Sequence, residues 1–254
     1  MAAGNFPDPV LAWTKEEEGG YVNHPRDPGG ATNIGVTQRT YDAWRKKRGR
    51  SQRSVRLITM DEVADIYRTG YWNAISGDQR PGGVDYVIYD AAVNSGVSRA
   101  KSWAAKAAST RGAAAFIDRY CDIRMGFLRG LRHWGTFGKG WTRRVARVRA
   151  RSHKLAGMPA VAMQKKAVTV AAKAEQTRAT VRQTTTAASI SATTSAGSGA
   201  AGAVTDAGSD LLWTSVVLGL IALGLAIAAV SWWRQHAYEE ASADELRRVA
   251  EGVS

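Results

Sequence analysis

The sequence predicts a mainly α-helical α+β domain with one small β-hairpin, followed by a flexible linker and a single transmembrane helix. Three observations support this fold class. Apolar residues recur at helical spacing over most of the first 155 residues. Turn residues and β-branched residues gather in residues 21–37, which favours a short hairpin there. A charge-free apolar run at 211–233 follows a stretch rich in Ala, Thr, Ser and Gly.

The helix expected from residue 60 onward has the clearest start signal. Thr59 and Glu62 stand at capping-box spacing, and Ile58 and Val63 flank them as a hydrophobic staple. The longest amphipathic pattern steps by three or four residues through Phe116, Tyr120, Ile123, Phe127 and Leu131. Helices are therefore expected to build most of the domain.

The segment richest in chemistry is EEEGGYVNHPRDPGGATNIGVT, residues 16–37. Glu18 stands where a helix-like segment meets a Gly-Gly pair, a common helix stop. Asp27 follows nine residues later in a Pro/Gly-rich turn, and Thr32 and Asn33 come just after it. Glycoside cleavage needs a protonated carboxylic acid and a second group that holds charge or water. This pattern therefore predicts glycosidase chemistry.

The expected position of Glu18 favours the protonated form that an acid catalyst needs. The C-terminal end of a helix carries partial negative charge, which opposes ionisation. Glu16 and Glu17 add like charge beside it. The alternative is an ordinary solvated helix end, because charge runs are usually surface features.

Three segments carry a resemblance to a known family: EGGYVNHPRDPGGATNIGVTQRTYDAW, TMDEVADIYRTGYWNAISGDQRPGGVDYVIYDAAVNSG and FLRGLRHWGTFGKGWTRRVARVRA. Together they resemble glycoside hydrolase family 108, the phage- and prophage-encoded muramidases, over about residues 5–151. The resemblance implies a lysozyme-like fold and an endolysin that cleaves the β-1,4 bond between N-acetylmuramic acid and N-acetylglucosamine. It also implies that Glu18, the acid of the EGGY motif, is the catalytic acid.

A second resemblance, to small phage-type lysozymes, suggests the partners of Glu18. Its spacing to Asp27 and Thr32 is similar to the Glu, Asp, Thr triplet of small phage-type lysozymes. Asp27 would act as base or stabilise the developing positive charge, and Thr32 would position water. Because Thr32 comes one residue early for that pattern, Asn33 or Thr37 is an alternative, and both are expected to bind substrate.

Two further polar residues are expected near the substrate groove. The resemblance places Asp90 and Asn94 of DAAVNSG there, and capping or solvation is the alternative. Cys121 lies in an apolar-periodic segment, so we expect a core residue and not a nucleophile. The four histidines are scattered without metal-ligand spacing, so neither a metal nor a cofactor is expected.

The family resemblance, for residues 1–155, and composition, for the rest, imply five regions along the chain. They are a lysozyme-like glycosidase region at 1–83, a helical peptidoglycan-binding region at 84–155 that completes the fold, a basic and then Ala/Thr/Ser/Gly-rich linker at 156–210, a transmembrane helix at 211–233 and a charged tail at 234–254.

The apolar run at 211–233 has 23 residues and no charge. As a helix it would be about 34 Å long, enough for a bilayer core of about 30 Å. We therefore expect a single-pass C-terminal anchor in the bacterial inner membrane, with the catalytic domain acting on the periplasmic wall. The orientation stays open. Arg234 and its neighbours favour a cytoplasmic tail, whereas residues 1–15 lack a signal-peptide pattern, which favours cytoplasmic bulk.

The chain is basic, with a formal net charge of +13. Eleven Lys or Arg residues and one acid lie between Arg143 and Arg182. Such a stretch binds polyanions, but aromatic residues are not interleaved with it, so we expect no nucleic-acid partner. The expected partners are peptidoglycan, the inner membrane and a holin. A non-catalytic, membrane-anchored peptidoglycan-binding module and a holin-like scaffold are the alternative functions.

Overall fold

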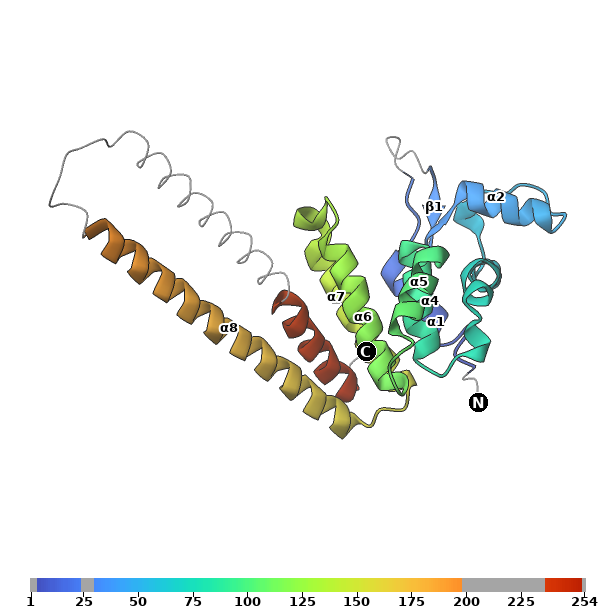
Figure 1. Cartoon of the computed structure of the whole chain (residues 1–254). Coiled ribbons are helices and arrows are strands. Elements are labelled where there is room, and N and C mark those ends of the chain that lie inside the picture. The colour runs from blue at the N-terminus through green and yellow to red at the C-terminus, as the bar shows by residue number, and fades with distance from the viewer. Residues whose placement is uncertain (1–3, 24–29, 198–235, 253–254) are drawn as a thin grey trace, which may run out of the picture. The chain divides into compact units, whose positions relative to one another are not determined.

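The computed structural model describes residues 4–23, 30–197 and 236–252 (Figure 1). The helices are α1 (Val10–Glu18), α2 (Gln38–Lys47), α3 (Met60–Tyr67), α4 (Val84–Ser95), α5 (Val97–Ala107), α6 (Ala113–Arg129), α7 (Trp134–Leu155) and α8 (Ala160–Gly197). Residues 236–250 are also helical. Short helical turns are η1 (Val55–Leu57), η2 (Arg68–Trp72), η3 (Asn73–Ile75) and η4 (Gly77–Gln79). The strands are β1 (Thr32–Asn33) and β2 (Val36–Thr37).

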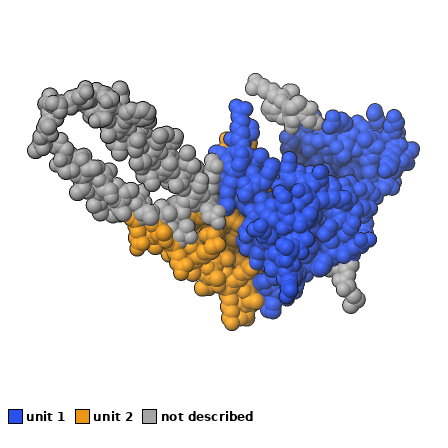
Figure 2. Space-filling view, viewed as in Figure 1, with its two compact units in different colours: residues 1–135, 147–159 blue, residues 136–146, 160–254 orange. Residues whose placement is uncertain are grey.

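The chain divides into two compact units (Figure 2). The first comprises residues 1–135 and 147–159, and the second comprises residues 136–146 and 160–254. The predicted catalytic and binding residues that the structure describes all belong to the first unit. The region predicted to bind peptidoglycan, 84–155, contributes residues to both units, and its separate role stays a prediction.

Helix α4 forms the centre of the first unit. All nine residues from Val84 to Ala92 are buried. The helix contacts α5 and α6 and the three turns η2, η3 and η4. The ring of Tyr89 packs against the rings of Phe6, Tyr67 and Trp72. A helix that is buried on every side belongs to a core, so α4 supports the elements that carry the site.

The predicted hairpin is confirmed, and it is short. Thr32 pairs with Thr37 and Asn33 with Val36 in antiparallel register. Ile34 and Gly35 connect the strands with φ angles of 50° and 69°. Two positive φ angles characterise a type I′ turn, whose twist suits a two-residue hairpin loop.

The predicted capping box at the start of α3 is also confirmed. The Glu62 backbone N–H donates to Oγ1 of Thr59 at 3.3 Å, and the Thr59 N–H donates to Oε2 of Glu62 at 3.0 Å. These bonds satisfy two of the backbone donors that a helix start leaves unpaired.

Glu62 also binds partners that lie far from the cap. Its carboxylate accepts from the Tyr41 hydroxyl at 2.7 Å and pairs with Arg45 at 3.0 Å and with Arg53. Burial raises the pKa of Glu62, but the Thr59 and Tyr41 hydrogen bonds and the two arginine charges outweigh burial and lower it overall. The carboxylate therefore stays ionised at the centre of a cationic cluster.

The predicted membrane anchor is corrected by the structure. In the ranges 4–23, 30–197 and 236–252, no helix is both long enough and apolar enough to cross a membrane. The segment expected to span the membrane, 211–233, lies outside these ranges. The fold is a mainly helical, lysozyme-like domain with a two-stranded antiparallel sheet, and the inner-membrane location inferred from the anchor is not supported.

The flexible tether predicted at 184–209 is helical as far as Gly197, and the linker role of 156–210 stays a prediction. Helix α8 runs without interruption from Ala160 to Gly197. The sequence has neither Pro nor Gly from 160 to 196, and Ala, Lys, Gln and Arg are strong helix formers. The Thr- and Ser-rich stretch from 184 therefore continues the helix. Residues 198–210 lie outside the described ranges.

Cys121 on α6 is fully buried, and burial raises the pKa of its thiol to about 12. We expect the folded protein to react with a thiol reagent at pH 8 at least a hundredfold more slowly than the protein unfolded in guanidinium, because the thiolate is the reactive form. Absorbance of the released reagent anion measures both rates. Rapid labelling of the folded chain would contradict the core assignment.

Candidate active site

Glu18 is the last residue of α1. The helix stops at Gly19, whose φ of 73° leaves the helical region and whose N–H donates to the Lys15 carbonyl at 3.1 Å. The Glu18 side chain is half-buried and lies against the hairpin turn. A Cβ added to Gly35 would lie 3.1 Å from Cγ of Glu18 and would overlap the Tyr67 hydroxyl oxygen. Glycine at position 35 therefore lets the turn approach Glu18 closely.

The other two acids of the EEE run point to α7. Glu17 accepts from Nε of Arg147 at 2.7 Å and from Nη2 at 3.2 Å. Glu16 pairs with Arg151 at 2.7 Å, and the Arg151 guanidinium also lies 4.9 Å from the Trp13 ring centroid. Both acids are therefore paired with arginines of α7. The EEE sequence by itself gave no indication that Glu16 and Glu17 bind arginines of α7.

Two tyrosines complete the surroundings of Glu18. The Tyr67 hydroxyl donates to the Ile34 carbonyl at 3.0 Å, and the Tyr67 ring lies 5.5 Å from the Tyr71 ring. Burial raises the pKa of Tyr71, and the negative charge of Glu18 raises it further. The two side chains therefore interact electrostatically. Tyr71 lies on η2, a π-helical turn, and such turns often occur at functional sites.

These tyrosines were missed in the sequence. The one signal was Gly70 inside the aromatic stretch YRTGYW. It indicated an irregular helix end, but it did not show which way the tyrosine side chains would point.

The hairpin brings three predicted residues together. Thr32 lies opposite Thr37, and its hydroxyl donates to the Gly30 carbonyl at 3.3 Å. Oγ1 of Thr37 accepts from the Thr40 N–H at 3.2 Å and so caps α2. The Asn33 amide donates to carbonyls of η1. Each residue thus supports local structure, and their roles in catalysis and substrate binding stay predictions. Asp27 lies outside the described residues.

Asp90 and Asn94 lie on α4, apart from the hairpin. Asp90 is buried and accepts from Nη1 of Arg124 at 2.5 Å. Nη2 of the same buried guanidinium donates to Oδ1 of Asn94 at 3.1 Å. Arg124 therefore joins α6 to both residues. The structure gives them a packing role, and substrate binding stays a prediction for each.

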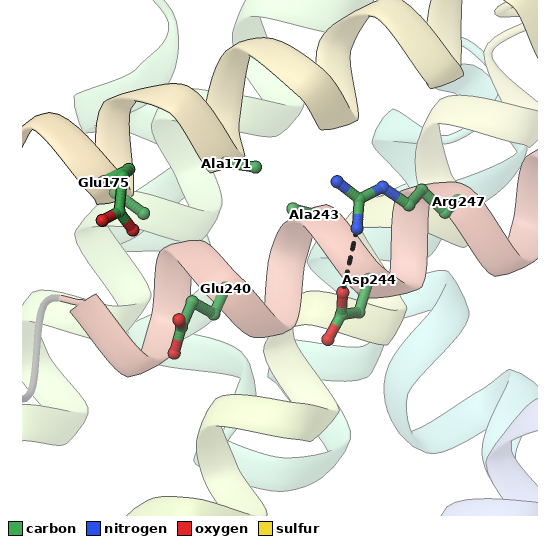
Figure 3. Close-up of a pocket in the computed structure, with 7 residues that line it drawn as sticks. Ala171, Glu175, Glu240, Ala243, Asp244 and Arg247 are labelled. Carbon is green, nitrogen blue, oxygen red and sulfur yellow. Dashed lines mark hydrogen bonds and ion pairs between the residues drawn. The ribbon is translucent and has the colours of Figure 1, made fainter.

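A hollow of about 380 Å³ lies within the second unit (Figure 3). It is lined by Ala171, Ala174, Glu175, Glu240, Ala243, Asp244 and Arg247. Its acids are paired. Asp244 accepts from Arg247 at 3.5 Å, and Glu175 and Glu240 both bind Arg178. None of the predicted site residues lines it, and no cluster of His, Cys, Asp and Glu suited to a metal occurs in the described part of the chain.

Comparison with known proteins gives a matching family and a similar structure. The family, described as Glycosyl hydrolase 108, matches residues 11–96, which include Glu18, the hairpin and α4. Among solved structures, SagA of Brucella abortus is 39% identical, with 58% of this chain aligned to 93% of that chain and a TM-score of 0.50. No curated protein matches. The expected membrane and holin partners gain no support from these matches.

We expect Gly35→Ala to lower both stability and wall lysis. Its methyl group would overlap the Tyr67 hydroxyl and press on Glu18, at a φ of 69° that disfavours alanine. The loss of unfolding free energy in urea should be about 2–4 kcal/mol, with at least a tenfold loss of lysis. Gly49→Ala is the matched control, because φ is 65° and the space is open. It should cost only about 1–2 kcal/mol and leave lysis intact. Equal effects of the two variants would refute the close contact.

Asp90→Asn should destabilise the protein by about 3 kcal/mol, because it leaves the buried Arg124 charge uncompensated. Urea unfolding monitored by circular dichroism measures the change. Asp122→Asn, on the same helix as Arg124 and 55% exposed, should have little effect. If Asp90→Asn kept its stability and raised KM for wall fragments, direct substrate binding would replace the packing role.

Proposed function

Since the chain belongs to the glycosyl hydrolase 108 family and is a glycoside hydrolase that acts on peptidoglycan, we propose that it is a lysozyme-type N-acetylmuramidase. Its substrate bond would be the β-1,4 linkage between N-acetylmuramic acid and N-acetylglucosamine. The observation that most supports this proposal is the position of Glu18, which ends α1 against the hairpin turn while its two acidic neighbours are bound to α7.

Glu18 would act as the general acid. It would donate its proton to the glycosidic oxygen as the bond to the muramic acid carbon breaks, while positive charge develops on the sugar ring. Its half-buried side chain lies at the C-terminal end of α1, against the hairpin turn. Tyr67 would limit the directions in which the carboxyl group can turn, because its hydroxyl and Glu18 both lie against Gly35, and Tyr71 lies beside the Tyr67 ring.

Asp27 would stabilise the positively charged sugar or activate water as a base. Thr32 would hold that water, with Asn33 or Thr37 as alternatives. The pairing of Thr32 with Thr37 supports this grouping, because it puts two hydroxyl-bearing residues on neighbouring strands that meet at the turn beside Glu18.

Glu18→Gln tests the mechanism, because the amide keeps the size of the side chain and loses the transferable proton. We expect the turbidity loss of a wall suspension to slow by at least about a hundredfold, as is typical for removal of a general acid. Binding of the protein to sedimented walls should persist. Glu175→Gln, an exposed acid of the second unit, should lyse walls at the native rate.

Mass spectrometry of digested peptidoglycan identifies the bond. New reducing muramic acid ends are expected. Free peptides without such ends would refute the proposal in favour of an amidase or peptidase. Native lysis by Glu18→Gln would exclude Glu18 as the acid. Wall binding without any lysis by the unmodified chain would favour a non-catalytic binding module.

A further inference from the structure

Tyr21 and Arg56 form an exposed pair of side chains that has no role in the proposed mechanism. Tyr21 follows Glu18 by three residues, and 39% of its surface is exposed. The Arg56 guanidinium carbon lies 5.3 Å from the centroid of the Tyr21 ring. An aromatic ring beside a guanidinium group offers an apolar surface and several hydrogen-bond donors at one place.

The hairpin holds this pair in place. Val22, next to Tyr21, exchanges two backbone hydrogen bonds with Thr32, both at 2.8 Å. The Asn33 amide donates to the Arg56 carbonyl at 3.3 Å and to the preceding carbonyl, of Val55, at 3.2 Å. Strand β1 therefore binds the Tyr21 segment and η1, and its turn contacts Glu18. The hairpin thus contacts the proposed acid and the segments that carry the pair.

Arg56 differs from four of the arginines that precede it. Arg45, Arg50 and Arg53 all bind Glu62, and Arg48 binds Asp65. Within the described ranges, no carboxylate pairs with Arg56. Its positive charge is therefore available to an anionic ligand, whereas the charges of the other four are largely used within the fold.

We propose that Tyr21 and Arg56 form a subsite for a sugar unit that bears a carboxylate. The inference rests on the proposed function and deepens it, because it identifies the part of the glycan that is recognised. The Tyr21 ring would pack against the C–H face of the sugar. The Arg56 fork would bind a carboxylate with two parallel hydrogen bonds. In peptidoglycan this group is the lactyl carboxylate of a stripped muramic acid or a carboxylate of its peptide stem.

Binding measurements on the full-length Glu18→Gln protein test the proposal without turnover. Three probes are compared by isothermal calorimetry: glycan strands freed of peptides, strands that keep their stems, and chitin oligosaccharides, which carry no carboxylate. The parent should bind one or both carboxylate-bearing probes more tightly than chitin. Preference for stripped strands identifies the lactyl group, and preference for stem-bearing strands identifies the peptide.

Arg56→Ala, added to Glu18→Gln, should weaken the preferred probe about tenfold and leave chitin binding unchanged. Arg56→Lys should recover only part of the loss, because it restores charge without the fork. Tyr21→Ala should weaken all three probes. Arg99→Ala is the matched control, because Arg99 is exposed and lies 4.5 Å from the Phe127 ring centroid on other helices. It should bind all probes like the parent.

Equal binding of all three probes by the Arg56→Ala protein and its parent would overturn the subsite. That failure is separable from failure of the proposed function. If the wild-type chain releases reducing muramic ends but Arg56→Ala has no effect on binding, only the subsite is wrong. If the wild-type chain releases no such ends, the muramidase proposal itself fails.

Discussion

The site depends on how the end of α1 is attached to α7. Arg147 and Arg151 bind Glu17 and Glu16, and the side chains of Glu17 and Arg151 are 8% and 3% exposed. In each pair one member is buried and its partner is partly exposed, so the pair adds little net stability, but losing the partner leaves a buried charge unpaired. Their effect here is therefore mainly one of orientation. With two acids drawn to α7, the remaining acid of the run, Glu18, lies against the hairpin.

Features fixed by neighbours in the sequence were predictable. The Thr59–Glu62 capping box, the Gly19 helix stop and the hairpin all appear where their local patterns indicated. Local signals failed in the second unit. The Thr- and Ser-rich end of α8 suggested a tether, although its alanines and the lack of Pro or Gly permit a helix. The expected anchor, based on hydropathy alone, fell on 211–233, outside the described residues.

The site was less predictable because its decisive contacts join distant parts of the chain. Glu17 and Arg147 are 130 residues apart, so no spacing rule could pair them. The sequence suggested that Asp90 faces the groove, but it could not show that Arg124, on another helix, occupies the carboxylate. Tyr71 was missed because a π-helical turn shifts the face on which later residues appear. Glu18 could be proposed from the sequence because its motif is contiguous.

The cluster around Glu62 makes the order of a whole loop depend on one ionisable group. Between α2 and α3 the chain has only the three-residue turn η1, and ordering each loop residue costs about 1–2 kcal/mol of backbone entropy. Arg45, Arg50 and Arg53 offset that cost through a shared carboxylate whose pKa is lowered. This stabilisation is complete at neutral pH and is lost as the pH falls through the lowered pKa. Strong acid is therefore expected to loosen the loop between α2 and α3, which contains Arg56.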